Sequence, residues 1–142
     1  MQLPKTSMFP PRAIIDTNVV ISGFLNPGNS REVLLLAAAQ SFLAFSSPSL
    51  EQELLRILRE KFKHTGKNLE REIETYRTII YRFVYPEETL SVVKADSADN
   101  RVLEAAEEAK ADFVITGDKH LLSLGSYKAI KIVTPANFLP FF

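Results

Sequence analysis

The sequence predicts an α/β protein, a three-layer α/β/α sandwich with a central, mainly parallel sheet. Short apolar runs alternate with segments of about ten residues or more whose apolar positions recur at helical spacing, and this alternation is typical of βαβ units and a parallel sheet. Two of the apolar runs end in an aspartate, Asp16 and Asp118. Buried strands end in this way where they deliver polar side chains to the ligand-binding edge of such a sheet.

Size and composition indicate one domain. The chain has 142 residues, 46% of them hydrophobic, and domains commonly hold about 100–150 residues, so we expect a single domain over 1–142 with its core at about 12–135. Seventeen basic residues balance seventeen acidic ones, which leaves only a local patch for attracting a polyanion. The absence of cysteine excludes disulfides, thiolate metal sites and cysteine nucleophiles.

Neither a targeting segment nor a membrane span is predicted. The first eleven residues contain no apolar targeting region, and the apolar run 33–39 is far below the roughly 18 residues that cross a bilayer. We therefore expect a cytoplasmic protein.

Breakers and caps define the elements of the first half. Asn-Pro-Gly-Asn at 26–29 interrupts the chain, and the helix predicted after it, from Arg31 to about Gln40 with Ser30 as N-cap, is apolar almost all round and should be buried. Ser-Pro-Ser at 47–49 opens another helix, because serine caps a helix and proline suits its first turn. The strands predicted in this half are 13–15 and 42–45.

The second half continues the same alternation. A helix is predicted from Leu69 to about Tyr85, ended by Pro86, and the β-branched content of 89–93 indicates a third strand. Ser97 is expected to cap a helix that runs to about Lys110. The remaining predicted elements are a fourth strand and turn at 112–118, a short helix at 121–124, a fifth strand at 130–133 and a final helical turn from Thr134.

Four carboxylates are expected to meet at one edge of this sheet: Asp16 and Asp118 after their strands, and Glu53 and Asp99 in the first turns of helices that begin at the same edge. Two carboxylates about 4 Å apart repel by roughly 4 kcal/mol at an effective dielectric near 20. A hard divalent cation such as Mg²⁺ or Mn²⁺ removes this repulsion, since both bind oxygen ligands. Such a metal also activates water and orients a phosphodiester, so the constellation indicates a nuclease.

Each acid alone also has a structural explanation. Asp16 could cap a turn, Asp99 could favour the dipole of its helix, Glu53 could lie on a solvated helix face, and Asp118 could cap the short helix that follows it. Only the convergence of all four favours a metal site.

Three further polar residues lie close to these acids in the sequence. Asn18 and Thr116 could contact a substrate phosphate or hold the acids in place. Asp96 could be an auxiliary acid of the site or could form a turn before Ser97.

Four motifs carry a resemblance to a known family. They are Ile14-Ile15-Asp16-Thr17-Asn18, then Ser49-Leu50-Glu51-Gln52-Glu53-Leu54, then Asp96-Ser97-Ala98-Asp99-Asn100 with Ala105-Ala106, and finally Ala111 to Asp118. Together they resemble the successive motifs of the PIN-domain family, in the family's order and from about Arg12 to Pro135.

The resemblance implies a PIN-like fold and a Mg²⁺- or Mn²⁺-dependent ribonuclease in which Asp16, Glu53, Asp99 and Asp118 match the family's acidic quartet. Glu51 competes with Glu53 for the second position of that quartet. Within the family the chain looks like the VapC-like toxins of toxin–antitoxin modules, which implies an RNA substrate, a homodimer and inhibition by a small antitoxin protein.

Other functions remain to be compared with this one. A phosphatase would need a second aspartate where Asn18 stands, and a receiver domain would need a lysine after its last strand, whereas Lys131 lies within it. A PIN-like module that binds RNA or protein without catalysis would keep the same acids. The excess of basic residues over 56–82 could contact RNA phosphates or form an ordinary solvated helix face.

Overall fold

A mainly parallel sheet forms the middle of the computed structural model, which describes residues 9–93 and 97–142. Within these residues the sheet has six strands: β1 (Arg12–Ile15), β2 (Leu43–Ser46), β3 (Arg82–Phe83), β4 (Phe113–Ile115), β5 (Ser126–Tyr127) and β6 (Ile130–Val133). They lie in the order β3-β2-β1-β4-β6-β5, and only the β5–β6 pair is antiparallel.

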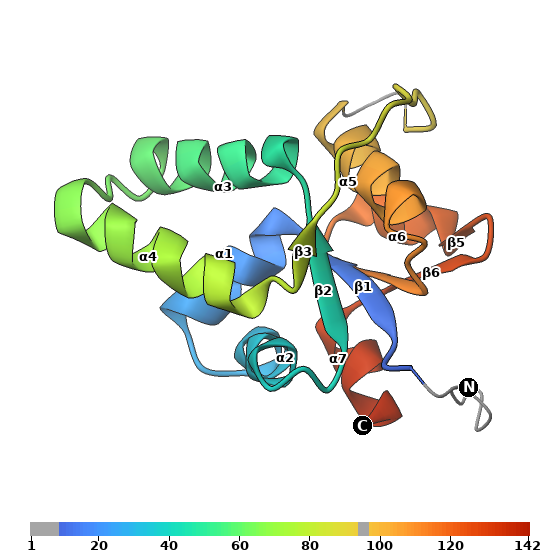
Figure 1. Cartoon of the computed structure of the whole chain (residues 1–142), viewed down its shortest axis with the longest axis horizontal. Coiled ribbons are helices and arrows are strands. Elements are labelled where there is room, and N and C mark those ends of the chain that lie inside the picture. The colour runs from blue at the N-terminus through green and yellow to red at the C-terminus, as the bar shows by residue number, and fades with distance from the viewer. Residues whose placement is uncertain (1–8, 94–96) are drawn as a thin grey trace.

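Helices cover both faces of the sheet, which confirms the predicted three-layer α/β/α sandwich (Figure 1). One layer holds α1 (Thr17–Leu25), α2 (Asn29–Ala38), α3 (Pro48–Glu60), α4 (Gly66–Ile79) and α7 (Pro135–Phe138), which continues into the 3₁₀ turn η1 (Leu139–Phe141). The other layer holds α5 (Ser97–Glu108) and α6 (Lys119–Leu124).

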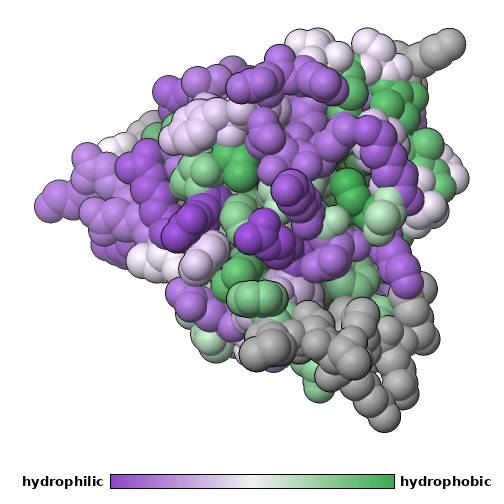
Figure 2. Space-filling view, turned by 45° about the vertical axis from the view of Figure 1, so that its right-hand side comes forward, coloured by the Kyte–Doolittle hydropathy of each residue, from purple (hydrophilic) through white to green (hydrophobic). Residues whose placement is uncertain are grey.

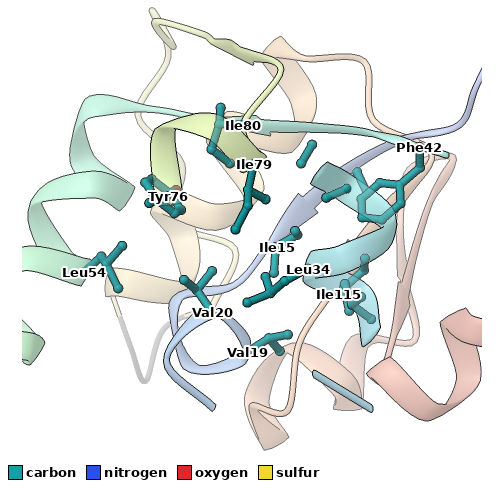
Figure 3. Packing of buried hydrophobic residues seen from close by; sticks show 14 of the residues in the cluster. Ile15, Val19, Val20, Leu34, Phe42, Leu54, Tyr76, Ile79, Ile80 and Ile115 are labelled. Atoms are coloured by element: carbon teal, nitrogen blue, oxygen red, sulfur yellow. The ribbon is translucent and has the colours of Figure 1, made fainter. Parts of the chain in front are cut away.

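Alternating side chains of the strands fill the two cores. Ala13 and Ile15 of β1 pack with the α1–α4 layer, whereas Ile14 between them packs with α5 and α6, as the two-residue period of a strand requires. Figure 3 shows Ile15 and Ile115 from neighbouring strands beside Leu34 of α2. All three are at most 5% exposed, so this face of β1 is closely packed.

The helix α1 was not among the predicted elements. Its β-branched residues and Gly23 favour a strand or a turn by intrinsic propensity, yet Asp16 caps it and five of its residues are buried. A Cβ atom on Gly23 would lie 2.5 Å from Leu34 Cδ1 and 3.1 Å from the Ser30 carbonyl oxygen. The glycine therefore lets α1 approach α2 closely, and tertiary packing outweighs propensity here. The next helix begins at Asn29 after Gly28, so the predicted cap at Ser30 is wrong by two residues.

The third strand predicted at 89–93 is wrong. Residues 89–93 have no regular structure, and their backbone groups are bonded by side chains of α5. Glu104 accepts a hydrogen bond from the Leu90 N–H at 2.8 Å, and Asn100 bonds both the N–H and the carbonyl of Val93 at 2.7 Å. These polar partners replace the ladder of a sheet.

The edge strand β3 lies earlier in the chain instead. The helix expected over 69–85 ends at Ile79, and Tyr81 and Val84 then donate backbone hydrogen bonds to Ala44 and Ser46 of β2. Part of the segment predicted as the end of a helix therefore forms the short strand β3 (Arg82–Phe83) at the edge of the sheet.

The carboxyl-terminal aromatics pack on the sheet. Thr134 accepts a hydrogen bond from Asn137 N and caps α7, as its sequence predicts. Phe138 is fully buried, with its ring centroid 4.9 Å from that of Phe42 and 5.3 Å from that of Phe113 in edge-on contact.

The surface is largely polar. Hydrophilic atoms cover much of the face seen in Figure 2, with hydrophobic atoms scattered among them. In the part of the chain that the structure describes, no helix is long and apolar enough to cross a membrane.

The order of the strands reverses at a defined place. From β1 the chain proceeds to β2 and β3 on one side, whereas β4, β6 and β5 lie on the other side. Ligands of open α/β sheets bind at the carboxyl ends of the strands where the order reverses in this way. That position lies between β1 and β4, just before Asp16 and Thr116.

Candidate functional site

Asp16 is held rigidly at the end of β1. It is only 6% exposed, and its Oδ1 accepts a hydrogen bond from Thr17 N at 2.8 Å as the N-cap of α1. Its Oδ2 accepts a hydrogen bond from the Thr116 hydroxyl at 2.7 Å, and its own N–H donates to the Ile115 carbonyl. Each carboxylate oxygen therefore keeps acceptor capacity for a further ligand.

The environment of Asp16 opposes its negative charge. Burial raises the pKa of Asp16 from 3.8 to about 6, against the lowering effect of the hydrogen bonds from Thr116 and Thr17. The negative charges of Glu53 and Asp118 raise this pKa further. Glu53 and Asp118 therefore lie close enough to Asp16 for their charges to affect its pKa.

Asp118 stands where the loop after β4 turns into α6. As N-cap it accepts hydrogen bonds from His120 N at 2.8 Å and Leu121 N at 3.1 Å. Partial burial raises its pKa, but hydrogen bonds from the Asp99 side chain and from these two N–H groups lower it more, so the pKa of Asp118 lies below its ordinary value. The Asp99 side chain therefore lies close to Asp118.

Thr116 connects the two strand-end aspartates. Its hydroxyl donates to Asp16 and accepts from the Asp118 N–H at 2.9 Å, and the side chain is completely buried. The sequence left open whether Thr116 contacts substrate or holds the acids. In the structure it holds them.

Glu53 and Asp99 come from two helices that begin at the same edge (Figure 1). Glu53 is half-buried in the second turn of α3, whose N-cap is Ser47. Asp99 is 4% exposed in the first turn of α5. The expected convergence is therefore present in pairs, with Asp16 beside Glu53 and Asp118, and Asp118 beside Asp99.

Residues 12–120 match the family of the PIN domain. The chain belongs to the PIN-domain family. It is also 32% identical over 140 residues to the uncharacterized protein MJ1680 of Methanocaldococcus jannaschii, an alignment that covers 90% of this chain and 89% of the relative. PIN domains are generally nucleases that use divalent metal ions, so nuclease-like action on nucleic acid is the family function to compare with the site.

The two competing glutamates of α3, Glu51 and Glu53, have different surroundings in the structure. Both oxygens of Glu51 accept hydrogen bonds from Arg77 of α4, at 3.1 Å from Nε and 2.8 Å from Nη2. Glu51 is therefore engaged by the neighbouring helix, whereas Glu53 contributes its charge to Asp16. The choice between them depends on a residue 26 positions further along the chain, so the motif could not have decided it.

The other predicted site residues have different outcomes. Asn18 is exposed in the first turn of α1, and Asp96 falls outside the described residues. Asn100 was not among the predicted residues, yet it is 5% exposed and joins Val93 to the start of α5. It ties the backbone of Val93 to the first turn of α5, which also carries Asp99. The sequence signal for this role is only an amide next to an acid, which is common on helix surfaces as well.

The carboxylates of the PIN domain are not arranged as a complete metal cage. Among residues 9–93 and 97–142, no group of three or more acidic or histidine side chains is close enough to hold a metal ion as it stands. The donor chemistry still fits a hard divalent cation, because all four side chains offer oxygen and such cations retain several waters. Burial, and in addition the charges of Glu53 and Asp118, raise the pKa of Asp16, and a cation bound beside this carboxylate would stabilise its negative charge.

Proposed function

We propose that this PIN-domain protein is a Mg²⁺- or Mn²⁺-dependent endoribonuclease in which Asp16, Glu53, Asp99 and Asp118 bind the metal and form the catalytic site. The observation that carries the proposal is Asp16. It is a buried carboxylate at the switch point of the sheet, fixed by two hydrogen bonds, and its pKa is raised to about 6 by burial and by two neighbouring acids. If Asp16 served only as a helix cap, acidic neighbours such as Glu53 and Asp118 would only weaken it by repelling its negative charge.

In this proposal the residues around the four acids have different roles. Thr17 and Thr116 orient the Asp16 carboxylate, and Thr116 also fixes the loop that carries Asp118. Asn18, exposed on the first turn of α1, is positioned to contact the RNA strand. When bound, a divalent cation supplies a water of lowered pKa and stabilises the leaving oxygen of the phosphodiester. Asp96 remains a proposed auxiliary acid.

Calorimetric titration of Mn²⁺ tests the metal site. We expect binding to the wild type and none to the double variant Asp16→Asn with Asp99→Asn. Asp112→Asn is the matched control, because Asp112 is an exposed aspartate that precedes β4 and accepts from Arg12 N at the opposite edge. Indistinguishable titrations of the wild type and the folded double variant would contradict the metal site.

Cleavage of RNA tests the activity itself. We expect Mn²⁺-dependent cleavage of single-stranded or structured RNA by the wild type and a loss of at least a hundredfold in Asp16→Asn, as for removal of a group essential to catalysis. The alternative is a silent PIN-like module, which is favoured by the incomplete metal cage. Equal RNA binding by both proteins with no cleavage by either would support that alternative.

We further propose that the protein is the toxin of a toxin–antitoxin pair, acting in the cytoplasm as a homodimer that a small antitoxin protein inhibits. The support is the resemblance of its motifs to VapC-like toxins. Induced expression in a bacterial host should arrest growth with the wild type and not with Asp16→Asn. Light scattering of the purified protein separates a dimer from a monomer.

A further inference from the structure

A cavity between α3 and α5 adjoins the acidic site and has not been given a role. Its volume is about 330 Å³, and its lining includes Ser49, Gln52, Glu53 and Arg56 of α3 together with Ser97 and Arg101 of α5. We call it the arginine pocket. Glu53 forms part of its wall and also acts on Asp16, so the pocket opens beside the proposed catalytic carboxylates.

The positions of these side chains follow from helical spacing. Glu53 and Arg56 are three residues apart on α3, and Ser97 and Arg101 are four residues apart on α5, so each pair lies on one face of its helix. The two faces line the same cavity. Two arginines from separate helices therefore line one space.

Arg56 is available for a ligand. Its side chain is 52% exposed, and its partner Glu60, at 3.2 Å, is 63% exposed. An exposed i,i+4 pair of this kind contributes little to stability, so a phosphate can replace Glu60 at little cost.

Arg101 is held in place. It is 33% exposed, and its Nη2 donates to the Leu90 carbonyl at 3.2 Å and to Glu104 Oε2 at 2.8 Å. Within the described residues these bonds use Nη2, and the Nε of Arg101 is buried without a hydrogen-bond partner, so the guanidinium keeps a donor that the protein does not satisfy. An anchored guanidinium loses little conformational entropy when it binds an anion.

We propose that the arginine pocket binds a backbone phosphate of the RNA strand next to the phosphodiester that is cleaved, an inference that rests on the proposed function. An RNA strand that approaches four carboxylates is repelled by them. Besides a bound cation, only a local patch of positive side chains can offset this repulsion, because the chain has no net charge. Guanidinium groups match phosphate oxygens in geometry and in charge. The pocket is lined by Arg56, one helical turn from Glu53 on α3, and by Arg101 of α5.

Binding of RNA without cleavage tests the pocket directly. A fluorescent ten-nucleotide single-stranded RNA is titrated with the protein in EDTA at several salt concentrations and followed by anisotropy. We expect Arg56→Gln to bind about fivefold more weakly, and its slope of log affinity against log salt to be smaller by about 0.7, as for the loss of one phosphate contact on a single strand.

The matched control is Arg59→Gln. Arg59 lies on α3 one turn further on, is exposed and does not line the pocket, so the same change of charge should alter affinity less than twofold. Equal losses in Arg56→Gln and Arg59→Gln would show a general charge effect and overturn the inference, as would a wild type that does not bind. Arg101→Gln should weaken binding similarly, and a melting curve shows whether that variant has kept its fold.

Cleavage in Mn²⁺ separates the pocket from the proposed function. We expect Arg56→Gln to raise KM about fivefold with kcat within twofold of the wild type. An unchanged KM in a protein that cleaves RNA would overturn the pocket and leave the nuclease intact. No cleavage by the wild type, with the Arg56-specific loss of binding retained, would overturn the nuclease and leave the pocket as an RNA-phosphate site.

Discussion

Asp16 makes the free energy of unfolding depend on pH in a direction that can be measured. Its carboxyl group has a pKa of about 6 in the folded protein and an ordinary value of 3.8. Between these two values the folded state binds more protons than the unfolded state, so stability falls as the pH rises through this window. Above about pH 6 the full cost is present, and at about 1.4 kcal/mol for each pH unit it amounts to about 3 kcal/mol.

Replacement by asparagine removes this dependence. The stability of Asp16→Asn relative to wild type should increase by about 2.5 kcal/mol between pH 4 and pH 8, most of the full cost. Any change in the hydrogen bonds to Thr17 and Thr116 affects the variant at every pH and cancels in this difference. Asp16, which we propose as a metal ligand, therefore destabilises the folded state at neutral pH.

Urea denaturation in EDTA at pH 4, 5, 6, 7 and 8 measures the effect for both proteins. Asp112→Asn controls for the loss of one negative charge, since Asp112 is exposed at the opposite edge of the sheet. A relative gain below about 1 kcal/mol for Asp16→Asn over this range, or an equal gain for Asp112→Asn, would refute the assignment of the raised pKa to burial of Asp16.

Three further changes test the packing around the site by thermal or urea denaturation. Thr116→Val should lose about 1–3 kcal/mol because it leaves buried partners unbonded, while Thr116→Ser keeps the hydroxyl and should lose less; equal losses would count against the bonds. Phe138→Ala should cost about 3–5 kcal/mol and Phe142→Ala, at a 46% exposed position, under half of that. Gly23→Ala should cost about 1–3 kcal/mol because its Cβ meets Leu34, and an unchanged midpoint would show that α1 and α2 can separate.

The positions of Asp16 and Asp118 in the fold were predictable because their sequence signals are local. An apolar run followed by an acid identifies both a buried strand and the residue at its end, and this held for Asp16 and for Asp118. Parallel pairing of β1 with β4 then brings the two ends together. The partner that distinguishes Glu51 from Glu53 is instead a distant arginine, and a local motif carries no information about it.

The errors in the fold have a common physical cause. At 89–93 the β-branched residues indicated a strand, but the side chains of Asn100 and Glu104 satisfy the backbone there. In α1 the same residue types form a helix, because Gly23 permits close contact with α2. In both places the outcome depends on a partner from another segment, and propensity describes only the segment itself.

The hydrogen bond between Thr116 and Asp16 joins residues 100 positions apart, and this has a consequence for the biosynthesis of the protein. A nascent chain that has emerged only as far as α5 lacks β4. It also lacks Thr116, which donates a hydrogen bond to Asp16, and the loop that carries Asp118. A partial product of translation that ends before Asp118 therefore cannot assemble the four carboxylates. The ribosome that makes the chain is exposed to the completed site only after almost all of the protein has been synthesised.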